Sequence, residues 1–474
     1  MDTARRSSIR PHRLAMAILG LGLLACLGLN LPGQLSYDSV AQLHDGHFGI
    51  YNGWHPPVMA FLLGIADAVV PGTGLFVAFD AVLFFAGAAL LLGIGSQPRW
   101  TAPAAAAVLV LMPQVLLFEG IVWKDVLFAD SAIAGFASIA FAAAQWESRG
   151  LRFGWLSAGL VLLVLGALAR QNGAIALAFG IAAIGVLAAT KAKGRPARAL
   201  ASYATAALAA ALVLNGAASV ALGMRTPGGS GTQAQLRLLA FYDLIGAIKD
   251  RPDLKLKHLT QARPDLVALM REDGVRLYTP ERNDTLAQSA ELQSELADTQ
   301  ASVMLAQWKD LVIHHPMTYL KLRARVFDWV FLTPRLDRCF PVYVGVSGLP
   351  AYMRDLHLTQ RLRPQDSWLK AYATAFVGTP VYSHLTFALL ALGELALLLR
   401  RRSAADLAMA FLLASALAFV ASFFVIAIAC DYRYLLFLDL SALVGGLYLA
   451  AARPQNRPKA GAGLAGDAKP HEFV

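Results

Sequence analysis

The sequence of 474 residues repeatedly contains apolar stretches that are long enough to cross a lipid bilayer. A helix rises about 1.5 Å per residue, so a hydrocarbon core of about 30 Å requires roughly 20 apolar residues. By this measure we expect ten membrane spans, at residues 14–31, 75–95, 101–118, 126–145, 154–169, 173–190, 200–223, 377–399, 404–429 and 434–452. Only 15% of the residues are charged and 57% are hydrophobic, whereas soluble domains contain about 25% charged residues. This composition excludes a soluble globular protein and a disordered chain, and it predicts an all-α polytopic membrane protein.

The sidedness of these spans depends on residues 56–70, which begin with Pro56-Pro57 and include Asp67. A helix of this length reaches only about 20 Å, which is short for a crossing. If the segment does not cross, the short loops on the side of the N-terminus, with both tails, hold eighteen Lys and Arg residues, and the opposite short loops hold three. Basic residues gather on cytoplasmic loops. We therefore expect residues 56–70 to form a re-entrant or interfacial helix, and both termini to lie on the cytoplasmic side of the inner membrane.

The chain divides by composition into four parts. We expect an N-terminal transmembrane module at 1–224 with its first outer loop at 30–56, a mostly helical extracytoplasmic domain at 225–375, the last three spans at 376–453, and a cytoplasmic tail at 454–474. The first span follows a basic N-terminus and shows no small-x-small cleavage site, so it is expected to stay uncleaved. The net charge of +10 follows from the basic cytoplasmic loops and does not require a nucleic-acid partner.

The first outer loop contains no Lys or Arg, yet it carries Tyr37, Asp38 and His55. A carboxylate in this position can accept a proton from a hydroxyl group or hold a divalent metal ion, so Asp38 is a candidate catalytic residue. The structural alternative is that Ser36 or Asp38 is the N-cap of an amphipathic interfacial helix. The residues alone leave both interpretations open.

The other short outer loops each carry a cation with polar neighbours. The groups are Glu119 with Lys124-Asp125, Arg170-Gln171-Asn172, and Asp431-Tyr432-Arg433. Lys and Arg near a membrane are costly and often mark a ligand site. A phosphate group is a suitable partner, since Arg presents two donors to its oxygens and Lys a point charge. The alternative is local ion pairing, of Lys124 with Glu119 or Asp125 and of Arg433 with Asp431.

Three cysteines, Cys26, Cys339 and Cys430, allow at most one disulfide and match no metal-binding spacing. We expect Cys339 and Cys430 both to lie outside, but the sequence does not decide whether they are bonded.

Five short motifs in the expected outer loops resemble the GT-C superfamily of integral-membrane glycosyltransferases. They are Ser36-Tyr37-Asp38-Ser39, Trp54-His55-Pro56-Pro57, Trp123-Lys124-Asp125-Val126-Leu127, Ala169-Arg170-Gln171-Asn172-Gly173 and Asp431-Tyr432-Arg433-Tyr434. The resemblance implies that an acid of the first outer loop, here Asp38, is essential, and that Asp125 is the second acid. Asp38 has no adjacent acidic partner, and His55 stands where some relatives carry an acid and a Lys. A divalent metal therefore stays an open alternative.

The sequence thus predicts an inverting glycosyltransferase that moves a sugar from a polyprenyl-phosphate-linked donor to a glycan or lipid acceptor on the outer side of the membrane. Asp38 is the expected base, because the leaving phosphate needs charge stabilisation more than protonation. The expected substrate-binding residues are Tyr37, His55, Glu119, Lys124, Asp125, Arg170, Asn172, Asp431 and Arg433. The alternatives are a lipid-linked glycan polymerase or ligase, and a lipid or glycan transporter.

Overall fold

The computed structural model describes residues 2–51, 55–94, 99–223 and 231–451. Within these ranges the regular structure is helical, and β-pairing is limited to isolated bridges. The prediction of an all-α polytopic membrane protein is confirmed. The expected cytoplasmic tail at 454–474, Trp54 and the expected domain boundary at residue 225 lie outside the described residues.

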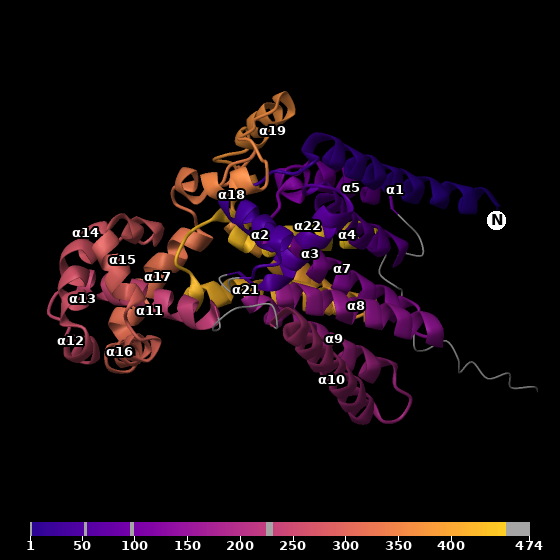
Figure 1. Ribbon diagram of the computed structural model, residues 1–474. Coiled ribbons are helices and arrows are strands. Elements are labelled where there is room, and N and C mark those ends of the chain that lie inside the picture. The colour runs from indigo at the N-terminus through magenta and orange to yellow at the C-terminus, as the bar shows by residue number, and fades with distance from the viewer. Residues whose placement is uncertain (1, 52–54, 95–98, 224–230, 452–474) are drawn as a thin grey trace, which may run out of the picture.

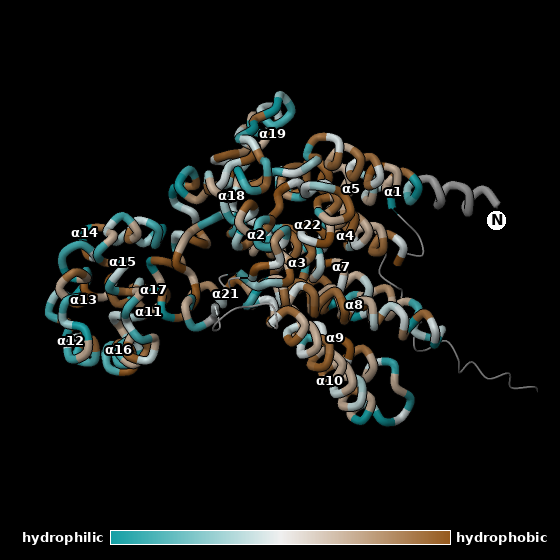
Figure 2. Tube along the Cα trace, in the orientation of Figure 1, coloured by the Kyte–Doolittle hydropathy of each residue, from teal (hydrophilic) through white to brown (hydrophobic). Residues whose placement is uncertain are grey.

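Eight of the described helices are long and apolar enough to cross a membrane. They form the part of the molecule that Figure 2 colours mostly brown, and Figure 1 labels them. These helices are α1 (Asp2–Asn30), α4 (Gly74–Ile94), α7 (Lys124–Ala144), α8 (Arg149–Ala169), α9 (Ala174–Lys191), α10 (Pro196–Gly223), α21 (Ala404–Ile426) and α22 (Leu436–Ala451).

Two of the ten expected spans differ from the structure. The stretch expected at 101–118 is broken into α5 (Thr101–Leu111) and α6 (Pro113–Leu116), with a bend of 58°. Pro113 lacks an N–H group and forces Met112 out of the helical conformation, which explains the break. The stretch expected from residue 377 begins instead at α20 (His384–Arg401), where the Ser383 hydroxyl caps the helix. α20 is not among the eight long apolar helices, so the described residues give eight such helices, or nine with the bent pair.

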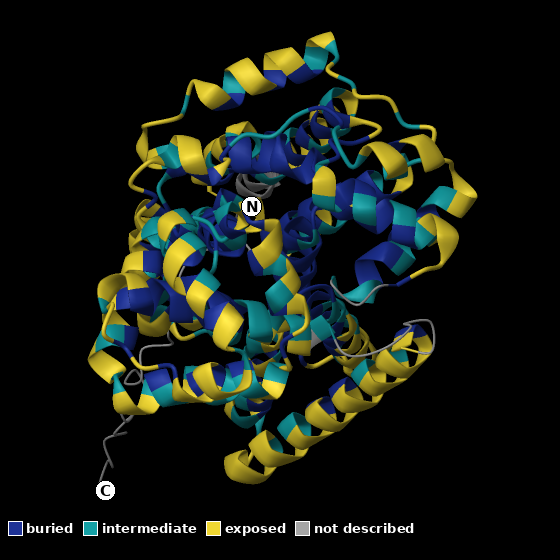
Figure 3. Ribbon diagram, turned by 60° about the vertical axis from the view of Figure 1, so that its left-hand side comes forward, coloured by how far each residue is buried: buried dark blue, intermediate teal, exposed yellow. Residues whose placement is uncertain are grey.

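Helix α7 lies at the centre of the bundle, and other helices cover most of its surface. Small residues allow the neighbouring backbones to come close, as is common between membrane helices. A Cβ atom added to Gly135 of α7 would lie 3.1 Å from the carbonyl oxygen of Gly159 in α8. A Cβ atom added to Gly159 would lie 2.8 Å from the carbonyl oxygen of Gly135. Figure 3 shows buried residues at the centre of the molecule and exposed residues on the peripheral helices. The tight centre therefore gives the N-terminus of α7, with Lys124 and Asp125, a fixed position.

Two short helices follow the first span. They are α2 (Tyr37–Phe48) and α3 (Pro57–Val69), and α3 has only 13 residues, as expected for a segment too short to cross alone. The backbones of the two helices touch, because there is no room for a Cβ atom between them. A Cβ atom added to Gly46 would lie 2.1 Å from the carbonyl oxygen of Ala60, and one added to Gly64 would lie 2.4 Å from the carbonyl oxygen of Gly46. This contact fixes α2, and with it Asp38, against α3.

The remaining helices belong to residues 231–382, which we call the polar unit. Figure 2 colours this unit mostly teal, and Figure 1 shows α11 to α17 together at one end of the molecule. The α-helices are α11 (Gly231–Asp250), α12 (Lys257–Ala262), α13 (Pro264–Leu269), α14 (Val275–Leu277), α15 (Ala290–Ala297), α16 (Ala301–His314), α17 (Pro316–Phe331), α18 (Pro350–Asp355) and α19 (Pro364–Thr374).

A buried arginine, Arg323, connects the polar unit to the membrane helices. Arg323 of α17 donates to Asp243 of α11 at 2.8 Å, and both side chains are fully buried. Arg323 also donates to the carbonyl oxygens of Phe424 at 2.8 Å and Ala427 at 2.7 Å, at the C-terminal end of α21. These carbonyls have no partner within the helix, so the guanidinium group satisfies them and fixes the end of α21.

Candidate active site

Asp38 lies in the first turn of α2, and the residues before it hold that turn in place. Ser36 is the N-cap residue, and its N–H donates to the Ser39 hydroxyl at 3.1 Å. The Trp123 indole donates to the Ser36 hydroxyl at 2.8 Å, and the Ser39 hydroxyl donates to the Val122 carbonyl at 2.6 Å. The start of α2 is therefore fastened to the segment that enters α7. Since Ser36 occupies the cap position, the carboxylate of Asp38 is available for other contacts.

The Asp38 carboxylate pairs with a cation from the other end of the chain. Arg433 donates to Asp38 Oδ2 at 2.6 Å, and His55 Nε2 lies 4.0 Å from Asp38 Oδ1. Burial by itself would raise the pKa of Asp38, but the charge of Arg433, the hydrogen bond from Arg433 and the nearby charge of Lys124 hold the pKa of this carboxyl below its ordinary value. Asp38 is therefore ionised at neutral pH, as a proton acceptor must be.

His55 and Lys124 form the next pair. Burial, together with the neighbouring charge of Lys124, lowers the pKa of His55 to about 4, so its imidazole is neutral at pH 7. Lys124 Nζ lies 3.3 Å from His55 Nδ1 and donates to it, which assigns the ring proton to Nε2, on the side of Asp38. Within the described residues, no carboxylate lies within ion-pair distance of Lys124, so neither pairing considered from the sequence, with Glu119 or with Asp125, is present. Its ammonium charge is thus left for a ligand.

Arg170 follows α8 and is ion-paired with Asp125 in the first turn of α7. Its Nε donates to the Asn172 side chain at 3.1 Å, and Asn172 donates to the Ser422 hydroxyl at 3.1 Å. The guanidinium group also lies 5.3 Å from the ring centre of Tyr434, within the range of a cation–π contact. These contacts hold the flat guanidinium plane in one orientation.

A cavity of about 560 Å³ joins these groups. Of the residues expected to bind substrate or to catalyse, seven line it: Asp38, His55, Lys124, Arg170, Asn172, Asp431 and Arg433. Asp125 lies directly behind, paired with Arg170 and 3.8 Å from Arg433 Nε. Segments that are up to 395 residues apart in the sequence thus meet at one cavity.

Besides Asp125, two expected site residues do not line this cavity. Tyr37 is 54% exposed and is not among the lining residues, since successive side chains of a helix differ in direction by about 100°. Glu119 is buried next to Asp80 and Asp130 between the spans. The structure therefore does not bring these two side chains to the cavity, and their role in substrate binding stays a prediction.

The polar unit contributes residues that the sequence did not indicate. Gln235, Leu236 and Leu239 of α11 line the cavity, as do Asn283 and Asp284. Phe423 and Ile426 complete its apolar side. The polar unit shows no recognisable motif, and its contacts with the end of α21 and with the loop after it bring these residues to the cavity.

A divalent metal does not fit the residues that are present. No group of three or more His, Cys, Asp or Glu side chains within the described ranges could hold a metal ion. The Asp38 carboxylate already contacts Arg433 and lies near Lys124, and cations so close oppose the binding of another cation. We therefore assign no catalytic step to a metal.

Comparison with known proteins gives structural neighbours only. No family model matches the chain, and no curated protein matches it. AglB from Archaeoglobus fulgidus, an archaeal oligosaccharyltransferase solved with an inhibitory peptide and a dolichol-phosphate, is 14% identical, with 92% of this chain and 50% of that chain covered and a TM-score of 0.40. ArnT from Cupriavidus metallidurans, solved with undecaprenyl phosphate, is 13% identical, with 92% and 77% covered and a TM-score of 0.35.

The chain spans half the length of the AglB chain that it matches. At such low identities and TM-scores the likeness carries no function over to this chain.

The Arg170–Asp125 pair gives a prediction on stability. Asp125 is 1% exposed, so Arg170→Gln is expected to lower the free energy of unfolding by about 3 kcal/mol, because a buried carboxylate loses its main partner. The double variant Arg170→Gln, Asp125→Asn should recover most of this loss. Thermal unfolding in detergent measures both. A double variant no more stable than the single one would contradict the assignment of the pair.

Proposed function

We propose that the protein is a membrane glycosyltransferase that moves a sugar from a polyprenyl-phosphate-linked donor to a cell-envelope glycan or lipid acceptor on the outer side of the cytoplasmic membrane. The observation that carries this proposal is a single cavity that holds an ionised carboxylate, Asp38, beside three cations, Lys124, Arg170 and Arg433. Sugar transfer from a lipid phosphate needs both, a base for the acceptor and positive charge for the leaving phosphate.

Asp38 is the proposed base. The acceptor hydroxyl transfers its proton to the Asp38 carboxylate while its oxygen forms a bond to the anomeric carbon. The bond from this carbon to the phosphate oxygen breaks, and its electron pair stays on the phosphate. Because attack and departure take place on opposite sides of the carbon in one step, the product has the inverted configuration. The neutral His55 ring, with its proton toward Asp38, helps to orient the carboxylate.

The three cations are proposed to bind the phosphate, but they differ in how far carboxylates already compensate their charge. Arg433 and Arg170 each contact a carboxylate in the structure, so part of their charge is already compensated. Among the described residues, Lys124 forms no ion pair, and its hydrogen bond is with the neutral His55 ring. We therefore assign the main contact with the phosphate to Lys124. The two Arg side chains are assigned to stabilise the negative charge that grows on the phosphate in the transition state.

The walls of the cavity suggest where the two substrates lie. Leu236 and Leu239 of α11 and Phe423 and Ile426 of α21 form an apolar wall, which suits the first isoprene units of the donor. Asn283 of the polar unit lies on the cavity as well and offers hydrogen bonds to a hydroxylated acceptor. The acceptor is thus proposed to approach from the polar unit, and the donor from the membrane helices.

The outward orientation of the cavity has two supports. The basic residues concentrate on the loops opposite to it. Cys339 of the polar unit and Cys430, beside the cavity residue Asp431, form a disulfide, and disulfides persist in oxidising compartments outside the cytoplasm. Cys26 is buried and free.

The proposal is tested with a polyprenyl phosphate that carries a radiolabelled sugar, added to right-side-out or inverted membrane vesicles containing the protein. We expect transfer of label to acceptor, with release of polyprenyl phosphate, when outer loops face the added substrate. A product ladder instead of one added sugar would indicate a polymerase or ligase. Movement of intact donor across the vesicle membrane without bond cleavage would indicate a transporter, and either result would overturn the proposal.

A further inference from the structure

The loop at residues 427–435, which carries Arg433, is held mainly by the polar unit. The contacts that join the two include Arg323 to the Ala427 carbonyl at 2.7 Å, the Asn283 N–H to the Ile428 carbonyl at 2.9 Å, the Cys430 N–H to the Glu281 carbonyl at 3.0 Å, and the disulfide of Cys339 with Cys430. Residues 281–283 therefore lie beside this loop through backbone contacts that do not depend on their side chains. A side chain placed there can act on the loop from a fixed position.

Arg282 is such a side chain, and it belongs to a series of alternating charges that ends at the proposed base. Arg282 Nη1 donates to Asp284 at 3.1 Å and Nη2 to Asp431 Oδ1 at 3.3 Å. Asp431 Oδ2 lies 3.3 Å from Arg433 Nη2, and the same Nη2 donates to Asp38 at 2.6 Å. The series therefore runs from the polar unit through the last outer loop to α2.

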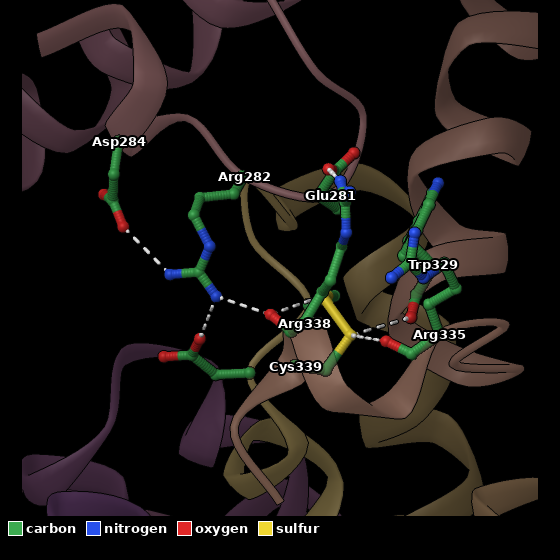
Figure 4. Close-up of a disulfide and its surroundings, with 9 residues drawn as sticks. Glu281, Arg282, Asp284, Trp329, Arg335, Arg338 and Cys339 are labelled. Atoms are coloured by element: carbon green, nitrogen blue, oxygen red, sulfur yellow. Dashed lines mark hydrogen bonds and ion pairs between the residues drawn. A yellow bond between two sulfur atoms is a disulfide. The ribbon is translucent and has the colours of Figure 1, made fainter. Parts of the chain in front are cut away.

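Two further contacts fix the orientation of Arg282. Its Nη2 also donates to the Arg338 carbonyl at 2.9 Å, and the guanidinium carbon lies 4.3 Å from the ring centre of Phe340. Figure 4 shows Arg282 between Asp284 and the Cys339 disulfide, with Arg338 beside it. The Arg338 side chain is in turn held by Glu281 at 2.6 Å. The Arg282 side chain is 19% exposed, so it makes these contacts in a largely desolvated position.

We infer that Arg282 is a positioning residue of the proposed reaction, which acts through Asp431 to keep Arg433 on Asp38. This inference rests on the proposed function for its kinetic consequences, but its structural part does not. Arg433 Nη2 is shared by two carboxylates, Asp38 and Asp431. Arg282 neutralises part of the charge of Asp431, and this leaves Arg433 bound mainly to Asp38. When Arg282 is removed, Asp431 competes more strongly for Arg433.

The consequence for Asp38 has a definite sign. The charged and titratable groups that face Asp38 are Arg433, His55 and Lys124. A weaker contact with Arg433 stabilises the ionised carboxylate less, so the pKa of Asp38 rises. The acid limb of the pH–rate profile then moves to higher pH. A role of Arg282 in folding alone would lower the amount of folded protein and leave the position of this limb unchanged.

The experiment compares Arg282→Ala, Arg282→Lys, Asp431→Asn and the double variant Arg282→Ala, Asp431→Asn, each as the full chain in nanodiscs and scaled to folded protein. For Arg282→Ala we expect kcat/KM to fall about tenfold and the acid limb to rise by roughly half a pH unit or more, and Arg282→Lys should restore part of both. In the Asp431→Asn background, Arg282→Ala should move the limb no further. Arg335→Ala is the control, because it removes an exposed ion pair with Asp337 near the same disulfide.

Hydrogen–deuterium exchange of the peptide at 427–435 gives a readout that needs no transfer activity. We expect faster exchange in Arg282→Ala and an unchanged rate in Arg335→Ala. An unmoved acid limb, or an equal effect of Arg282→Ala with and without Asp431, would overturn the inference. If the wild-type protein transfers no sugar, the proposed function fails, and the exchange data alone decide the positioning role: unchanged exchange in Arg282→Ala overturns it as well.

Discussion

The substitution Asp38→Asn is expected to reduce sugar transfer by roughly a thousandfold. The amide has nearly the same shape as the carboxylate, but it cannot accept the proton of the acceptor hydroxyl. Arg433 keeps its contacts with Asp431 and Asp125 in this variant, so we expect the protein to reach the membrane and to unfold near the wild-type temperature. Single-turnover transfer from a labelled donor measures the chemical step directly.

Asp355→Asn is the matched control for Asp38→Asn. Asp355 also contacts α2, through His44 at 3.3 Å, but it does not line the cavity. We expect this variant to transfer sugar within about twofold of the wild-type rate, because exposed ion pairs contribute little. Normal turnover in Asp38→Asn would remove Asp38 from the role of base, whatever the control shows.

The substitution Lys124→Gln is expected to raise the donor KM between roughly tenfold and a hundredfold, with a smaller change in kcat. A hydrogen bond to a charged group contributes about 1.5–3 kcal/mol. Lys124 forms no ion pair with a carboxylate among the described residues, so its loss frees no other cation that could bind the phosphate instead. The same variant should bind free polyprenyl phosphate more weakly to a similar extent. Calorimetry with the polyprenyl phosphate in nanodiscs measures this binding without any turnover.

Two variants serve as controls for Lys124→Gln. Lys124→Arg keeps the charge and should recover part of the affinity, and Lys255→Gln removes an exposed Lys of the polar unit and should bind polyprenyl phosphate like the wild type. Equal affinity of Lys124→Gln and wild-type protein would show that the phosphate binds elsewhere. The assignment of Lys124 would then be wrong, even if transfer activity is present.

The membrane architecture could be predicted from the sequence because hydrophobic length is a local property. A bilayer core sets the number of apolar residues that a span needs, and this number can be counted along the chain. The errors arose where local chemistry changes the helix itself, at the Met112–Pro113 break and at the Ser383 cap. The sidedness of the cavity stays a prediction, supported by the placement of the basic residues and by the disulfide.

The individual site residues could also be named in part from the sequence, since charged side chains near a membrane are costly and therefore informative. Asp38, Lys124, Arg170 and Arg433 were identified in this way, and the structure brings all four to one cavity. Tyr37 and Glu119 are expected at the site as polar neighbours of Asp38 and Lys124, but they do not line the cavity, because the direction of a side chain depends on its position along the turn that carries it. That direction cannot be read from the presence of a polar residue in a loop.

The amino-acid sequence alone thus indicates where the apolar segments lie, which loops carry charge, and which side chains are candidates for chemistry. Which charges meet depends on the folded chain. The fold pairs Asp125 with Arg170, leaves Lys124 without a carboxylate partner among the described residues, joins Cys339 to Cys430, and places Arg282 beside Asp431. The reason is that burial of a span depends on its own residues, whereas an electrostatic contact depends on distances of a few ångströms between segments that are hundreds of residues apart.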